Sequence, residues 1–174
     1  MITRAQKTPP TEWVRWVHAS RIIRASWETM QATPSATCVF CQIAAGTLPA
    51  AIVYETEDLV AFLDTRPLFP GHCLLIPRTH FETLTDLPED RVTPLFAAAR
   101  LLTAAVETAF DAEGSFVAIN NRVSQSVPHL HIHIVPRRRK DGLKGFFWPR
   151  RKYGDKDDFE KAQFALRHAI ERLM

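Results

Sequence analysis

The chain has 174 residues, of which 46% are hydrophobic, and a formal net charge of +3. A chain of this size and composition can bury one ordinary core, so we expect one compact domain. No run approaches the roughly 18 consecutive apolar residues of a membrane-spanning helix, and no secretory signal is recognisable. We therefore expect a cytoplasmic protein without stable membrane insertion.

Residues 1–35 differ in composition from the rest and form an N-terminal extension and linker. Their aromatic and aliphatic residues recur near helical spacing among arginines, which predicts a basic amphipathic helix. Such a helix could dock on the domain, lie on a membrane surface or act as a targeting segment. Alternatively, the protein starts at Met30, which would begin a self-sufficient domain, and the residues ahead of it are an over-long start. In either case, we expect the folded domain to span residues 36–174.

The rest of the chain predicts an α+β domain. Short β-rich runs at 51–56, 59–64 and 73–77, and alternating runs at 115–120 and 129–135, indicate about five antiparallel strands. Between Pro88 and Phe110, apolar residues recur at helical spacing in alanine-rich sequence, and Gly114 follows as a stop signal. A final amphipathic helix is expected from Phe159 to Leu173. We expect the helices to cover one face of the sheet.

Three cysteines make an odd count, and two of them, Cys38 and Cys41, are close together. This pair fits metal or thiol chemistry in a reducing compartment better than a disulfide framework. Cys73 lies inside an apolar run and is expected to be a small core residue.

Basic residues cluster at 137–140 and at 150–152. Such clusters favour a local anionic partner. A single-stranded nucleic-acid groove would also need interleaved stacking aromatics, which are sparse here, so we expect no nucleic-acid partner.

The segment 129–135 alternates histidine with apolar residues. On a strand, successive side chains point to opposite faces, so His129, His131 and His133 should share one face while the apolar residues fill the core. Three histidines could bind a metal, although three consecutive same-face residues on one strand strain to meet tetrahedral geometry. In the alternative that we favour, one neutral imidazole attacks phosphorus while a protonated neighbour offsets the phosphate charge.

This histidine pattern, preceded by residues 124–127, resembles the histidine-triad (HIT) superfamily. The similarity covers Cys38 to about Trp148, and its further segments follow in the family's order at 38–46, 61–64 and 70–80. The segments resemble the Hint and Fhit branches more than the galactose-1-phosphate uridylyltransferase branch, in which glutamine stands at the position of His133. The resemblance implies a HIT-like fold and a homodimer.

The resemblance also implies a reaction on an AMP-containing purine nucleotide that requires no cofactor. His131 would attack the α-phosphorus and form a nucleotidyl-histidine intermediate, which then passes to water. His133 would contact the phosphate, while His129 and His72 would support the imidazole network.

Further roles follow from the same resemblance. Ser126 and Gln125 would hydrogen-bond the phosphoryl oxygens or the leaving group, and Asp64 would accept hydrogen bonds from the ribose hydroxyls. Relatives carry glycine-rich sequence ahead of the Gln-Ser pair, which this chain lacks. Its Asn120 or the Arg122 guanidinium would replace the glycine-turn amides at the phosphate, unless Arg122 is simply exposed to solvent.

The opening Cys38 and Cys41 supply half of a tetrahedral zinc site. Relatives with this opening complete it with histidines that match His80 and His129, so the resemblance implies a closed, structural Cys₂His₂ zinc site. The alternative is a pair of free thiols on a loop. If His129 holds zinc, it is not a free acid–base group.

The leading functional hypothesis is a hydrolase of dinucleoside polyphosphates or nucleoside phosphoramidates, with the basic segment 137–152 offering charge to a polyphosphate. A phosphorylase that passes the intermediate to inorganic phosphate would use the same site. A non-catalytic nucleotide-binding regulator is the third alternative, against which the intact nucleophile weighs.

Overall fold

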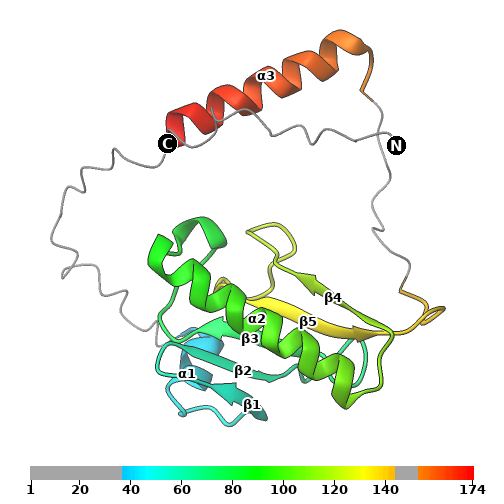
Figure 1. Cartoon of the computed structure of the whole chain (residues 1–174). Coiled ribbons are helices and arrows are strands. Elements are labelled where there is room, and N and C mark those ends of the chain that lie inside the picture. Colours follow the sequence, from blue (N-terminus) through cyan, green and yellow to red (C-terminus); the bar gives the residue numbers. More distant parts are fainter. Residues whose placement is uncertain (1–36, 144–152) are drawn as a thin grey trace, which may run out of the picture.

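The computed structural model describes residues 37–143 and 153–174 (Figure 1). Its elements, in chain order, are α1 (Val39–Ala44), β1 (Ile52–Glu55), β2 (Leu59–Leu63), β3 (Cys73–Pro77), the short 3₁₀ helix η3 (Leu84–Asp86), α2 (Glu89–Ala109), β4 (Gly114–Ala118), β5 (Ile132–Arg137) and α3 (Lys156–Leu173). The predicted N-terminal helix and the basic cluster at 150–152 lie outside the described residues.

The strands form one five-stranded antiparallel sheet in the order β1-β2-β3-β5-β4. At its centre, Leu75 of β3 lies opposite Ala61 of β2 and Ile132 of β5. The predicted α+β class with five antiparallel strands is therefore confirmed.

Both faces of the central strands are buried, because alternate side chains pack in opposite directions. Figure 1 shows α2 lying across one face. There Leu75 and Ile132 of the sheet belong to the same buried cluster as Leu95 and Leu102 of α2. The intervening residues of β2 and β3 pack on the other face with Phe40 and Cys41 of α1. The sequence predicted helices on one face of the sheet and missed α1 on the other. A helix of six residues is too short to show helical periodicity in the sequence.

Helix α2 has the predicted span, but its end is formed differently from the prediction. Asp111 follows the helix in the left-handed conformation, with φ 48°. The N–H of Ala112 donates to the carbonyl of Glu107 at 2.9 Å, and the N–H of Asp111 donates to the carbonyl of Thr108 at 3.4 Å. This is a Schellman arrangement with aspartate in the place usually taken by glycine. Gly114, the predicted stop, instead begins β4.

Among the described helices, α2 is also the one that is long and apolar enough to cross a membrane. Its apolar character has a structural explanation, because its inward residues form the main core with the sheet. Helix α3 confirms the predicted C-terminal helix, has Asp155 as its N-cap and buries none of its residues.

Candidate functional site

A cleft of about 800 Å³ lies on the α1 side of the sheet. Apolar side chains such as Phe40, Ile43 and Phe62 form much of its wall. The polar residues that line it are Asp64, Thr65, Arg66, Ser126, His131 and His133. An apolar cleft with a few convergent polar groups is the usual form of a small-molecule site.

His131 is held by main-chain and aromatic contacts. Its Nδ1 lies 2.6 Å from the carbonyl oxygen of His129, to which it must donate because a carbonyl only accepts. Its ring packs edge-on against Phe40, with centroids 5.3 Å apart, and lies 4.9 Å from the ring of His133. In the neutral imidazole, Nε2 then carries the free lone pair.

A second chain of hydrogen bonds fixes His133. The N–H of Leu68 donates to Nδ1 of His72 at 3.2 Å, so the neutral His72 carries its proton on Nε2. That Nε2 lies 3.0 Å from Nδ1 of His133 and donates to it. Oδ2 of Asp64 lies 3.6 Å from the same Nδ1, where it would attract a protonated His72 ring but accepts no hydrogen bond from the neutral one. The neutral His133 consequently keeps its remaining proton on Nε2 as a donor.

Burial makes these imidazoles hard to charge. It lowers the pKa of His133 to about 4, an effect that the neighbouring His131 and His72 strengthen and Asp64 opposes. Burial also lowers the pKa of His72, against the attraction of Asp64. Neither His133 nor His72 is therefore the protonated neighbour that we expected from the sequence.

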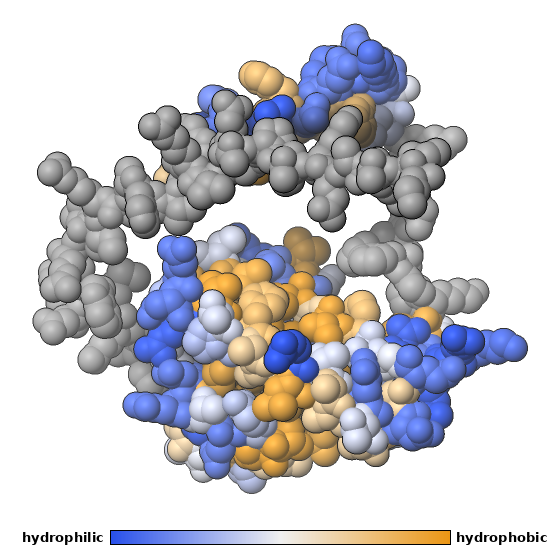
Figure 2. All heavy atoms as spheres, viewed as in Figure 1, coloured by the Kyte–Doolittle hydropathy of each residue, from blue (hydrophilic) through white to orange (hydrophobic). Residues whose placement is uncertain are grey.

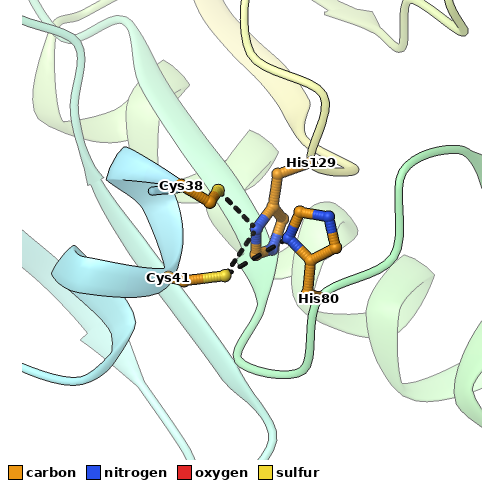
Figure 3. A group of neighbouring side chains, drawn as sticks. All are labelled: Cys38, Cys41, His80 and His129. Atoms are coloured by element: carbon orange, nitrogen blue, oxygen red, sulfur yellow. Dashed lines mark hydrogen bonds between the residues drawn. The ribbon is translucent and has the colours of Figure 1, made fainter. Parts of the chain in front are cut away.

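Four metal-type side chains meet beside the cleft (Figure 3). Cys38 and Cys41 come from the start of α1, His80 follows β3, and His129 precedes β5. Their donor atoms all lie within 4.8 Å of one another. The structure thus brings together the residues predicted as zinc ligands.

The spacing within this Cys/His cluster suits a tetrahedral ion. Sγ of Cys41 lies 3.2 Å from Nδ1 of His80 and 3.6 Å from Nδ1 of His129, and Sγ of Cys38 lies 3.5 Å from the latter atom. Zinc bonds of ordinary length to sulfur and nitrogen at a tetrahedral angle would separate the two ligand atoms by about 3.6 Å. His129 also donates from Nε2 to the carbonyl of Pro77 at 2.9 Å, which leaves the Nδ1 lone pair facing the sulfurs.

The loop before the histidines places three of its predicted site residues, Asn120, Arg122 and Gln125, outside the cleft lining. The amide of Gln125 bonds to main-chain groups, donating to the carbonyl of Glu82 and accepting from the N–H of Arg122, each at 2.6 Å. Asn120 donates to the carbonyl of Ser124 at 3.3 Å, and Arg122 is exposed. None of the three lines the cleft, so the expected phosphate contact of Asn120 or Arg122 has no support in this structure.

The loop lacks glycine, but two of its residues adopt backbone conformations that glycine adopts most easily. Arg122 and Ser124 have φ values of 65° and 60°, in the left-handed region that glycine occupies most easily. The chain thus makes a turn of this kind without glycine, and Ser126 still reaches the cleft.

Two groups at the site were not predicted from the sequence. Arg66 could have been predicted from the sequence, because it is a cation two residues after the proposed ribose-binding Asp64. The carbonyl oxygen of His129 could not have been, because every residue has one.

Residues 45–140 match the HIT domain family. An adenosine 5′-monophosphoramidase of Candida albicans is 31% identical over 132 residues, which cover 72% of this chain and 84% of the relative. An adenylylsulfatase of Arabidopsis thaliana is 36% identical over 61% of this chain and 55% of its own length. A bis(5′-nucleosyl)-tetraphosphatase of Schizosaccharomyces pombe is 37% identical over 52% of this chain and 50% of its own length.

Solved structures give the same grouping. A HIT family protein of Bacillus subtilis superimposes with a TM-score of 0.70 at 32% identity, over 76% of this chain and 96% of the other. A zinc-bound histidine triad family protein of Mycobacterium smegmatis superimposes with a TM-score of 0.59 at 35% identity, over 78% of this chain and 97% of the other.

Proposed function

Because the chain belongs to the HIT domain family, we propose that it is a hydrolase that cleaves a phosphoanhydride or phosphoramidate bond at the α-phosphate of a purine nucleotide. The observation that carries this proposal is the hydrogen bond from Nδ1 of His131 to the carbonyl of His129, which leaves an Nε2 lone pair on a residue that lines the cleft. The named relatives support it, since all three are hydrolases of adenine or nucleoside phosphate compounds by their names.

In the first step, Nε2 of His131 attacks the α-phosphorus, and the bond to the leaving group breaks with its electron pair. Nδ1–H keeps its bond to the carbonyl of His129, which stabilises the positive charge that develops on the ring. In the second step, water attacks the phosphorus and gives up a proton to solvent, the bond to His131 breaks with its electron pair, and the nucleoside monophosphate leaves. Where the first leaving group is an amine, it takes up a proton from solvent as it departs. His133, through Nε2–H, and Ser126, through its hydroxyl, would donate hydrogen bonds to phosphoryl oxygens.

The nucleoside would occupy the rest of the cleft. Asp64 would accept from the ribose hydroxyls, and the apolar wall that contains Phe40, Ile43 and Phe62 would receive the base. His72 would act as a positioning residue, since it contacts His133 and does not line the cleft.

We also propose that Cys38, Cys41, His80 and His129 hold a structural zinc ion. The metal would hold α1 against the segment before β5. Because four protein ligands would close the site, the metal would take no part in the chemistry. The sulfur–nitrogen distances and the zinc-bound relative support this assignment.

A homodimer is the proposed assembly. Strand β4 is an edge of the sheet, and Phe116 and Val117 on it are 38% and 44% exposed. Phe96 and Leu101 of the neighbouring α2 are 43% and 54% exposed, and Figure 2 shows apolar surface gathered over this side of the domain. An exposed edge strand beside an apolar helix face favours association with a second copy.

The reaction is tested by intact-protein mass spectrometry after rapid quenching with diadenosine tetraphosphate or with adenosine phosphoramidate. We expect an adenylate adduct on the wild-type protein and on His168→Ala, which removes an exposed histidine of α3, but not on His131→Ala. Adding inorganic phosphate should leave AMP as the product, whereas ADP would identify a phosphorylase. Nucleotide binding without adduct or product would contradict the proposal and favour a non-catalytic regulator.

A further inference from the structure

Arg66 is the one residue with a fixed positive charge among the described residues that line the cleft. It follows Asp64, whose carboxylate is the fixed negative charge of the same lining. The Oδ1 atom of Asp64 accepts from the main-chain N–H of Arg66 at 2.8 Å, which fixes the turn after β2 and keeps both residues at the cleft.

The guanidinium of Arg66 has no ion pair or hydrogen bond within the described residues, and it is exposed. Other described arginines contrast with it. Those that lie within 4 Å of a carboxylate are Arg78, Arg91, Arg137, Arg138 and Arg139. Within the basic segment 137–152, which we expected to offer charge to a polyphosphate, the described Arg137, Arg138 and Arg139 each lie within 4 Å of a carboxylate, whereas Arg66 does not.

The contacts proposed for the α-phosphate do not include this cation. They are the Nε2 atoms of His131 and His133 and the hydroxyl of Ser126, which line the cleft together with Arg66. A guanidinium binds phosphoryl and sulfuryl oxygens through two parallel N–H groups and is always charged. A cation at the cleft therefore fits a substrate with negative charge beyond its α-phosphate.

We propose that Arg66 binds a second phosphoryl or sulfuryl group of the nucleotide and so favours polyanionic substrates over phosphoramidates. This inference rests on the proposed function, because it assumes a nucleotide with its α-phosphate at His131. The second anion has two sources: the 5′ chain, where it belongs to the leaving group, or the ribose, beside Asp64.

Dissociation constants of AMP, ADP and adenosine 3′,5′-bisphosphate test the assignment in wild type, Arg66→Gln and Arg66→Lys. Arg66→Gln should weaken one of the two bisphosphorylated ligands by about five- to tenfold and change AMP by less than about twofold. Arg66→Lys should keep part of the affinity. Arg172→Gln is the matched control, because it removes an exposed arginine of α3 that does not line the cleft, and it should bind all three ligands like wild type.

A selective loss for ADP places the second anion on the 5′ chain, and a selective loss for adenosine 3′,5′-bisphosphate places it on the ribose. An equal loss for all three ligands, or no loss for any, overturns the assignment. Turnover of adenosine phosphoramidate separates this result from the proposed function. If wild type hydrolyses that compound while the Arg66 variants bind every ligand normally, only the inference fails; if the selective loss occurs without any turnover, the hydrolase proposal fails alone.

Discussion

At the residue scale, main-chain groups rather than charges set the proton positions of the cleft histidines. The carbonyl of His129 holds the proton of His131 on Nδ1, and the N–H of Leu68, acting through His72, holds that of His133 on Nε2. Each contact selects one tautomer of a neutral ring. The nucleophile and the donor beside it are thus prepared before a substrate arrives, provided that both rings stay uncharged.

The stability of the metal-free protein should fall in mild acid, in part because of His133. Its folded pKa is about 4 against about 6.5 in an unfolded chain. Between these values the unfolded state binds more protons, so this contribution is lost as the pH falls from about 6.5 toward 4. The decrease in Tm from pH 7 to pH 5 should therefore be smaller in His133→Asn than in wild type, while His168→Asn keeps the wild-type slope. Equal slopes in all three proteins would contradict the assignment to His133.

Removal of one thiolate should empty the Cys/His cluster. Cys41→Ala should lower the zinc content from about one per chain to near zero and lower Tm by roughly 10 °C, because metal binding contributes directly to folding. Cys73→Ala is the matched control: burial raises the pKa of this core thiol to about 11, and it lies outside the cluster. Plasma emission spectrometry and thermal scans check both variants. Full zinc content in Cys41→Ala would refute the ligand set.

At the element scale, the non-glycine end of α2 offers a direct test of backbone strain. Asp111→Gly should raise stability by about 0.5–1 kcal/mol, because glycine adopts the left-handed conformation at the helix end more easily. This corresponds to an increase in Tm of about 2–4 °C. Asp111→Asn removes the same charge while keeping a side chain, and it separates a conformational effect from an electrostatic one. If both variants gain equally in thermal scans, the unfavourable charge at the helix C-terminus is the cause.

Element boundaries failed to follow from the sequence where tertiary contacts override a local pattern. Alternation predicts a strand from His129, but β5 begins at Ile132. Pro77, which would lie opposite Leu130 if pairing with β3 continued, has no N–H to donate. The N–H of Leu130 donates instead to the carbonyl of Phe81 at 2.6 Å. The alternation still predicted burial correctly, since Leu130 is in the core with Ile132.

Some features of the candidate site could also be predicted from the sequence, and others could not. Its histidines, Asp64 and the cysteines were recognisable because their side chains form motifs in the sequence. The tautomers were not, since they depend on main-chain groups such as the carbonyl of His129, which are placed only by the fold. The charge state also differed from expectation, because the burial that lowers the pKa of His133 arises from packing between distant segments.

At the scale of the whole molecule, the exposed apolar side formed by β4 and α2 determines the expected assembly. Size-exclusion chromatography with light scattering should give about twice the 19.8 kDa of one chain. Leu101→Glu should shift the protein to the monomer, because it places a charge within the proposed contact. Val53→Glu changes an equally exposed apolar residue on β1, at the opposite edge of the sheet, and should leave the dimer intact. A monomeric wild-type protein would exclude this assembly.

The side chain and the main chain of His129 contact different partners. Its imidazole faces the cysteines, whereas its carbonyl oxygen accepts the hydrogen bond from Nδ1–H of His131. Any amino acid at position 129 would carry the same carbonyl, so mutation can remove the proposed metal ligand without removing the hydrogen-bond acceptor. The two features can consequently drift apart over evolutionary time: a lineage that loses its cysteines and this imidazole can still inherit the support of its nucleophile, as long as other packing keeps the backbone in place.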